Sequence, residues 1–342
     1  MKEKPVATIL QIQRMSTEDG PGIRTTVFFK GCSLACTWCQ NPESIIMKPQ
    51  LQWVGTRCIG CRTCIALCPE GALSLDQEGM TIDRQLCSDC GVCSEKCPST
   101  AMELLGTEWT LDDLVREVEK DRVYFEKSGG GITLSGGEPA LQADFALTFL
   151  QELKRRGIHT ALDTCGHLPR DVLLSLLPHV DLLLYDIKEI EPDRHREFTG
   201  SSNERILENL ISAVRYIESR ETPASLWIRT PVIPDATARA ENIRGIGNLI
   251  AQRLGGRVER WELCSFNNLC RDKYCRLDMD WRFKDYSLLN GNFMEELAWV
   301  ARNSGVDPAT VCWSGPTRSQ GGDHRDNAPR KGLRVIEGSN QG

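Results

Sequence analysis

The sequence predicts an α/β protein built on a parallel sheet, an open or partial barrel of six β/α units, with a cysteine-rich insert near its start. Apolar strand-like runs alternate with helical patterns from residue 106 onward, and a strand followed by a helix, repeated, is the pattern of parallel sheets. Eleven of the 16 cysteines fall between residues 32 and 97, and eight of these eleven lie in the insert. The count of six units favours a partial barrel over a closed barrel of eight.

Six segments are predicted as strands because they are short, apolar and rich in β-branched residues. They are residues 25–31, 132–137, 160–165, 180–188, 226–233 and 258–266. Helices are expected where apolar residues recur every three or four positions, at 144–157, 203–219 and 239–254. We therefore expect a barrel domain of residues 1–50 and 106–313, an insert at 51–105, and a disordered polar tail at 314–342.

The composition limits the classes of function. The formal net charge of -6 gives no basic footprint for nucleic acid, so protein or small-molecule partners are expected. The first residues do not resemble a signal peptide, and no run of 18 apolar residues predicts a membrane span. We expect a cytoplasmic protein with no membrane partner. Cysteines stay reduced in the cytoplasm, so their clustering indicates a metal site and not a set of disulfides.

The insert contains two copies of Cys-x2-Cys-x2-Cys-x3-Cys-Pro, at 58–69 and 87–98. Bacterial two-cluster ferredoxins use this spacing, and there the fourth cysteine of each run completes the other cluster. Zinc is the alternative, although zinc sites need neither four cysteines in a run nor the proline. The expected ligands are Cys58, Cys61, Cys64 and Cys97 for one 4Fe-4S cluster, and Cys87, Cys90, Cys93 and Cys68 for the second.

The stretch KGCSLACTWCQNPE, residues 30–43, places Cys32, Cys36 and Cys39 on one loop. Three thiolates hold three corners of a 4Fe-4S cluster and leave the fourth iron without a protein ligand. An open coordination position distinguishes a catalytic metal from a structural one. A small bidentate ligand, such as the amine and carboxylate of an amino acid, suits that position.

This Cys-x3-Cys-x2-Cys spacing, with Trp38 before the last cysteine, resembles the signature of the radical S-adenosylmethionine (SAM) superfamily. The wider stretch DGPGIRTTVFFKGCSLACTWCQNPES is similar more narrowly to the activating enzymes of glycyl radical enzymes, pyruvate formate-lyase activating enzyme among them. The resemblance extends over about residues 8–300. It implies a partial (β/α)6 barrel of the radical SAM type with an inserted ferredoxin-like domain.

The resemblance also implies which residues bind the cofactor. In the family the Gly-Gly-Glu motif, here within GGEP at 136–139, lies along the amino group of SAM. The next strand ends, LDTCG and YDIK, match positions that bind a monovalent cation and the SAM carboxylate, although such residues are also common as ordinary strand ends. The expected cofactor-binding residues are Trp38, Gly136, Gly137, Glu138, Asp163, Thr164, Asp186, Lys188, Arg229 and Asn242.

Two positions depart from the family. Residues 235–238 read Asp-Ala-Thr-Ala where the family often has Gly-x-Asn-Asp, and Asn242 stands where the pyruvate formate-lyase activating enzyme has a histidine that contacts SAM. In addition, Cys165 stands where a related enzyme has Asn. We interpret Cys165 as a packing variant. The remaining cysteines fit no cluster spacing and are expected to be free thiols, since Cys behaves as a small hydrophobe. They are Cys264, Cys270, Cys275 and Cys312.

The function implied by the resemblance is reductive cleavage of SAM to methionine and a 5'-deoxyadenosyl radical. That radical takes a hydrogen from the α-carbon of a glycine in a partner glycyl radical enzyme, so no protein acid or base is assigned. Flavodoxin or ferredoxin is the expected electron donor, in an anaerobic setting. Segment 263–281 is expected to help select the partner. The alternatives are a radical SAM enzyme acting on a small molecule and a non-catalytic iron-sulfur electron-transfer protein.

Overall fold

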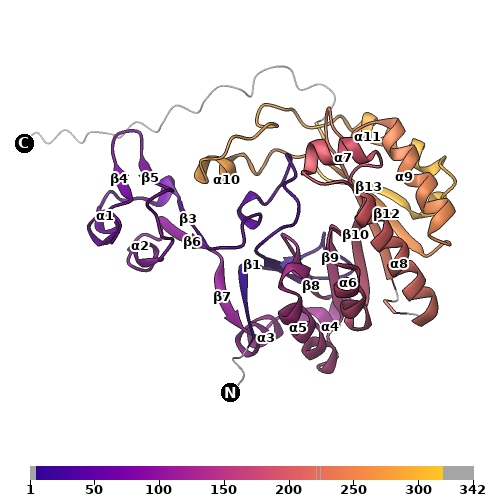
Figure 1. Ribbon diagram of the computed structural model, residues 1–342, viewed down its shortest axis with the longest axis horizontal. Helices are drawn as coiled ribbons and strands as arrows, with labels where there is room; N and C mark the ends of the chain where they lie inside the picture. Colours follow the sequence, from indigo (N-terminus) through magenta and orange to yellow (C-terminus); the bar gives the residue numbers. More distant parts are fainter. Residues whose placement is uncertain (1–4, 221, 224, 319–342) are drawn as a thin grey trace, which may run out of the picture.

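The computed structural model describes residues 5–220, 222, 223 and 225–318, and one nine-stranded sheet dominates it (Figure 1). The strand order is β13-β12-β11-β10-β9-β8-β2-β1-β7. The two outermost strands of this described sheet, β13 and β7, are not paired with each other, so the sheet remains open. The structure therefore confirms the predicted α/β class and the open parallel sheet.

Seven neighbouring strands run parallel, and they include all six predicted from the sequence. The seventh is β13. The predicted count of six is one too low because the four residues of β13 are too few to show a pattern. The parallel strands are β2 (Arg24–Phe29), β8 (Gly131–Gly136), β9 (Thr160–Thr164), β10 (Leu182–Asp186), β11 (Ser225–Val232), β12 (Val258–Ser265) and β13 (Val311–Ser314).

Two antiparallel strands extend the other side of the sheet. Strand β1 (Val6–Ser16) pairs with β2 and with β7 (Thr107–Thr110). Neither was predicted. Strand β7 follows the insert directly, so the chain re-enters the sheet next to the strand where it began.

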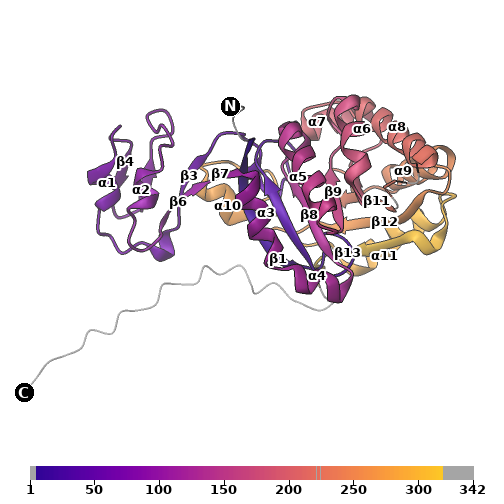
Figure 2. The ribbon, with the colours of Figure 1, turned by 90° about the horizontal axis from the view of Figure 1, so that it is seen from below.

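Helices α5, α6 and α8 lie along one face of the sheet (Figure 2), and the main core fills the space between. In α5 the buried residues include Phe145, Phe149 and Leu153, spaced four apart on one side of the helix. The helices of the barrel domain are α3 (Leu111–Glu119), α4 (Arg122–Ser128), α5 (Ala143–Arg155), α6 (Arg170–Leu176), α7 (Pro192–Thr199), α8 (Glu204–Arg220), α9 (Ala240–Arg253), α10 (Arg271–Arg276) and α11 (Gly291–Arg302).

Residues 50–105 form a small projection beside the barrel, here called the cysteine-rich lobe (Figure 1). It has its own apolar core, centred on Leu51, Leu73 and Met102. Its elements are β3 (Gln50–Trp53), α1 (Thr63–Leu67), β4 (Leu73–Leu75), β5 (Met80–Ile82), α2 (Val92–Glu95) and β6 (Met102–Leu105).

Two further predictions concern the chain's surroundings and its end. Among the described residues, no helix combines the length and apolar character needed to cross a bilayer. The predicted tail starts at Ser314, which is the last residue of β13, and residues 319–342 lie outside the described part of the chain.

The central core predicts a large difference between two leucine substitutions. Leu162 on β9 is fully buried, whereas Leu269 is 82% exposed. Leu162→Ala should lower the free energy of unfolding by roughly 2–5 kcal/mol, through lost burial and a residual cavity. Leu269→Ala should change it by no more than about 0.5 kcal/mol. Denaturant unfolding of both variants measures this, and equal losses would contradict the assigned core.

Candidate active site

The carboxyl ends of β8 to β11 bring most of the predicted polar residues together. Asp186 is in register with Arg229 on the neighbouring strand, and it also pairs with Lys188. Arg229 Nη1 lies 3.5 Å from Asp163 Oδ2. Ser135 Oγ donates to the same Asp163 oxygen at 2.6 Å. These side chains form one polar group at the edge where parallel sheets place their active sites.

Burial controls the charges in this polar group. It raises the pKa of Asp163 to about 6, against the opposing effect of Arg229. Burial by itself lowers the pKa of Arg229 and Lys188, but the carboxylates Asp163 and Asp186 more than compensate and both pKa values end well above the ordinary range. Two permanent cations therefore stand beside two acids, an arrangement suited to a ligand that carries both charges.

The three-cysteine loop, residues 32–39, follows β2 and is fixed by backbone hydrogen bonds on two sides. Cys32 N donates to the Ile45 carbonyl at 3.0 Å. Ala35 N and Thr37 N donate to the carbonyls of Thr199 and Phe198, each at 2.9 Å. The loop is thereby attached to α7, an element that the sequence did not indicate as part of the site.

The thiols of this loop are suited to a metal cluster. Burial raises the pKa of Cys36 to about 11 and that of Cys39 to about 12. Thiolates at these positions therefore need a nearby positive charge. Lys188 supplies one to Cys36, and iron would supply more. Three soft sulfur donors on one loop fit the predicted cluster.

The Gly-Gly-Glu turn allows β8 to approach this loop closely. Gly136 has φ +111°, a conformation that favours glycine. A Cβ on Gly137 would lie 2.0 Å from the Gly31 carbonyl oxygen. Gly137 N donates to the Phe29 carbonyl at 2.9 Å, and Glu138 N donates to that of Gly31 at 2.7 Å. Only glycines permit this contact between the two strand ends.

Glu138 is fully buried, and its carboxylate is used inside the protein. It accepts hydrogen bonds from Thr164 Oγ1 at 2.7 Å, Cys165 N at 3.0 Å and Cys165 Sγ at 3.1 Å. Ala140 N donates to its other oxygen at 3.2 Å. Burial, with the Cys165 thiol, raises the pKa of Glu138 well above its usual range. The structure thus places Glu138, Thr164 and Cys165 in one buried network.

Two other predicted residues lie in packed surroundings. Trp38 is buried against Phe198, with 5.9 Å between ring centroids. Asn242 is fully buried; it accepts from Ile190 N at 2.8 Å and donates to the carbonyls of Lys188 and Thr237 at 3.2 Å. Asn242 therefore fixes the segment that follows Lys188. A direct contact of either residue with SAM remains a prediction.

The loop that departs from the family, residues 235–238, is well anchored by its own hydrogen bonds. Thr237 is fully buried, and its hydroxyl accepts from Ile233 N at 2.9 Å and donates to the Pro231 carbonyl. Asp235 accepts from the Tyr286 hydroxyl at 2.9 Å. The different sequence therefore still forms a defined turn at the end of β11.

The cysteines of the lobe form two groups with the same local structure. Ala72 N donates to Cys68 Sγ at 3.3 Å, and Ala101 N donates to Cys97 Sγ at 3.2 Å, each from four residues downstream. A residue in the left-handed region precedes each short helix, Arg62 before α1 and Gly91 before α2. One small cavity is lined by four cysteines, Cys68, Cys87, Cys90 and Cys93.

The second group of lobe cysteines is recognised because charges on its members affect one another. Cys97 lies close enough to affect the pKa of both Cys61 and Cys64. The structure thus brings together cysteines of different runs, as the sequence pattern predicts. No three His, Cys, Asp or Glu side chains in the described part of the chain converge closely enough to hold a single metal ion.

Helix α10 and the residues after it connect the lobe to the three-cysteine loop. The Tyr274 hydroxyl donates to the Cys39 carbonyl at 3.0 Å, and its ring stacks on Trp281. From the lobe, Arg84 Nε lies 3.1 Å from Asp278 Oδ2, and Arg84 Nη2 donates to the Arg276 carbonyl at 3.0 Å. Segment 263–281, expected to select the partner, therefore also joins two cysteine sites.

Five cysteines lie outside the cluster motifs, Cys165 among them, and none of the 16 forms a disulfide. Cys270 is buried and Cys275 is exposed. Cys264 is close to Arg229, and burial raises its pKa to about 11. Cys312 Sγ accepts from Arg260 Nε at 3.1 Å. These contacts agree with the expectation of free thiols.

Comparison with known proteins gives the class to which this geometry belongs. The family model of the radical SAM superfamily matches residues 26–243. A radical SAM methyltransferase from Sphaerobacter thermophilus shares the fold, with TM-score 0.51 and 14% identity over 91% of this chain and 78% of that one. The chain belongs to the radical SAM superfamily.

Closer relatives narrow this class. The chain is 43% identical to the isethionate sulfite-lyase activating enzyme of Oleidesulfovibrio alaskensis, over 81% of this chain and 88% of that protein. It is 36% identical to the (2S)-3-sulfopropanediol dehydratase activating enzyme of Klebsiella oxytoca, over 88% of this chain and 95% of that protein. Within the superfamily it belongs to the activating enzymes of glycyl radical enzymes, which cleave SAM reductively and install a glycyl radical in a partner enzyme.

His195 on α7 predicts a pH dependence that the sequence did not suggest. It is 1% exposed, its Nδ1 lies 2.6 Å from the Ser201 carbonyl, and burial lowers its pKa from 6.5 to about 4. Between those pH values the unfolded chain binds more protons, so stability is complete above pH 6.5 and falls as the pH approaches 4. The loss is roughly 3 kcal/mol at most.

The pKa of His195 can be measured by NMR of the ring in isotopically labelled protein. We expect the imidazole to remain neutral at pH 5.5. His195→Gln should be less stable at pH 7.5 but should lose less further stability down to pH 5. A measured pKa of 6 or above would contradict the burial of this ring in α7.

Proposed function

We propose that this activating enzyme holds three 4Fe-4S clusters and that each has a separate task. The observation that carries the proposal is the position of three half-buried thiols on one loop beside the paired charges at the strand ends. Cys32, Cys36 and Cys39 would hold the SAM-binding cluster. The two lobe groups would hold the others, Cys58, Cys61, Cys64 and Cys97 in one and Cys87, Cys90, Cys93 and Cys68 in the second.

When bound and reduced, the cluster at the three-cysteine loop supplies the electron that cleaves SAM. The side chains at the strand ends would orient the zwitterionic end of SAM. Lys188 and Arg229 are the cations for its carboxylate, and Asp163 and Asp186 are the acids for its ammonium group. The Gly136 and Gly137 backbone brings the β8 end close enough to contact the ligand.

A bound monovalent cation is not part of the proposal. Asp186 already pairs with Lys188, and Asp163 with Arg229. The Thr164 hydroxyl donates a hydrogen bond to Glu138 Oε2. The chain's own cations thus balance the two acids that a monovalent ion would otherwise neutralise.

The lobe would receive electrons from flavodoxin or ferredoxin. Ile59 is 68% exposed and Leu86 54% exposed, and each is next to a predicted ligand cysteine. Such apolar residues suit the small, transient contact of a redox partner. From the lobe, Arg84 contacts the α10 segment, and Tyr274 of α10 contacts the Cys39 carbonyl. We assign this segment as the route by which electrons reach the three-cysteine loop.

The experiment that tests the function uses protein purified without oxygen, reconstituted with iron and sulfide, and reduced. Its electron paramagnetic resonance spectrum should change when SAM is added, and 5'-deoxyadenosine should form slowly. Cys36→Ala should lose both the SAM-dependent spectral change and the formation of 5'-deoxyadenosine, because the two remaining thiols of the loop no longer hold the cluster. The matched control, Cys275→Ala, removes an exposed thiol outside the motifs and should keep both. Spectra indifferent to SAM, without nucleoside, would favour a plain electron-transfer protein.

The role of the lobe is tested separately. Cys87→Ala should leave the SAM-dependent spectral change intact, because Cys87 lies outside the three-cysteine loop. It should slow reduction of the SAM-binding cluster by flavodoxin several-fold, as followed by rapid-freeze spectroscopy. Reduction by dithionite, which needs no docking surface, is the control. An unchanged rate with flavodoxin would remove the lobe from the electron route.

A further inference from the structure

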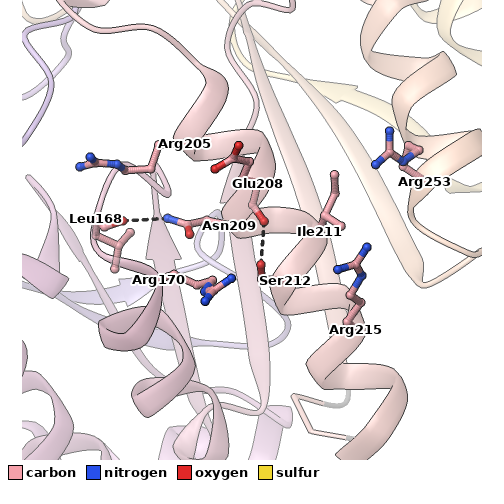
Figure 3. A pocket seen from close by; sticks show the side chains of 9 residues that line it. All are labelled: Leu168, Arg170, Arg205, Glu208, Asn209, Ile211, Ser212, Arg215 and Arg253. Atoms are coloured by element: carbon pink, nitrogen blue, oxygen red, sulfur yellow. Dashed lines mark hydrogen bonds between the residues drawn. The ribbon is translucent and has the colours of Figure 1, made fainter.

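A pocket of about 540 Å³ lies on the outer wall of the barrel domain, away from the site described above (Figure 3). Helix α8 forms its centre, and the first residue of α6 and the last residue of α9 reach it from either side. The residues that line it are Leu168, Arg170, Arg205, Glu208, Asn209, Ile211, Ser212, Arg215 and Arg253. Its volume is within the range of small-molecule sites.

The charge of this pocket is unusual for the chain. Four of its nine residues are arginines and one is an acid, although the whole protein has a net charge of -6. No ion pair or side-chain hydrogen bond joins any of the four arginines to another described residue. Elsewhere exposed arginines commonly pair, as Arg122 does with Glu126 and Arg302 with Glu295. Four cations with a single acid among them leave an excess of positive charge, which is unfavourable, and a bound anion would remove that cost.

The floor of the pocket is joined to the three-cysteine loop. Asn209 is 2% exposed, and its amide donates to the carbonyls of Gly166 and Leu168 at 2.9 and 2.8 Å. Between them, the His167 carbonyl accepts from Ser33 Oγ at 2.7 Å. Arg205 is close enough that its charge, after burial, lowers the pKa of the His167 imidazole. Segment 166–168 therefore contacts the pocket on one side and the cluster loop on the other.

We propose that this pocket binds a compact polyanion with two or more phosphate groups, and that its occupancy is coupled to the SAM site through segment 166–168. Guanidinium groups present paired N–H donors that match phosphate oxygens, so arginine suits such a ligand better than a point charge does. A ligand held by Arg170 and Arg205 would restrain the segment that supports Ser33. The proposal does not depend on the electron route or on the identity of the partner.

Binding is tested on the full-length, cluster-loaded protein with inorganic pyrophosphate and with ADP, by calorimetry at about 0.15 M salt, where weak surface attraction is screened. We expect saturable binding of one pyrophosphate per chain. The double variant Arg205→Gln, Arg215→Gln should weaken it about tenfold or more, given the strength of charged hydrogen bonds. Tighter binding of ADP than of pyrophosphate would identify a nucleotide as the source of the phosphates.

The matched control is Arg244→Gln, Arg257→Gln, which removes two exposed arginines that have no described ion pair and lie outside the pocket. It should bind pyrophosphate as the parent does, and thermal melting should show that both double variants fold. Equal weakening in both would mean non-specific attraction and would overturn the site. Binding of a polyglutamate peptide with no binding of pyrophosphate or ADP would indicate a protein partner and would overturn the small-ligand proposal.

The coupling has a separate readout. Because linkage is reciprocal, SAM should change the pyrophosphate affinity by the same factor by which pyrophosphate changes the SAM affinity. The spectral titration of the cluster with SAM measures the second factor. Ser33→Ala removes the hydrogen bond to the His167 carbonyl. In this variant pyrophosphate should still bind, but each ligand should change the affinity for the other by a factor closer to one. No effect of either ligand on the affinity for the other, or an unchanged effect in Ser33→Ala, would overturn the coupling.

Discussion

The buried carboxylate of Glu138 is the constraint on which the site depends. A carboxyl group taken out of water is costly unless its oxygens are hydrogen-bonded, and four donors meet that need here. Because two of those donors belong to Cys165, the end of β9 is tied to the turn after β8. The Glu138 backbone N–H in turn holds the Gly31 carbonyl, just before the first cysteine of the loop. One residue thus fixes three consecutive parts of the site.

The paired charges follow from the sheet itself. In parallel strands, residues in register lie side by side, so Asp186 and Arg229 must be neighbours once β10 and β11 pair. Every second residue faces the same side, which places Asp163 and Arg229 on one surface across the intervening strand. Because these side chains are buried, the charged form of each is stable only beside its oppositely charged partner. The charge arrangement is therefore a consequence of strand order, and not only of the individual motifs.

Local patterns could be predicted from the sequence, and contacts between distant segments could not. Six strands and the cysteine groupings follow from periodicity and spacing, whereas the four-residue β13 is too short to be recognised. The sequence names Asn242 as a site residue, but only the fold shows that it fixes the segment after Lys188. Tyr274 and Cys39 are 235 residues apart, so no local pattern indicates their contact. Arg205 and Arg215 read as an ordinary solvated helix face until α6 and α9 bring two more arginines beside them.

The way the lobe is attached explains how one chain accommodates it without disturbing the barrel. Its first and last residues, Gln50 and Leu105, are in register in the β3–β6 pair, so the insert leaves and re-enters the barrel at one point. At that point the fully buried Lys30 donates to the Glu43 carbonyl at 2.6 Å and to Gln50 Oε1 at 3.2 Å, which ties the exit to the end of β2. The lobe adds few constraints on the sheet because its two ends are already adjacent. The entropy cost of closing the chain between those ends falls on the lobe alone, and the sheet does not contribute to it. The orientation of the lobe then depends on the contacts of Arg84 with the α10 segment. The α10 segment also contacts Cys39. One segment therefore positions both the lobe and the three-cysteine loop, to which the lobe would pass electrons.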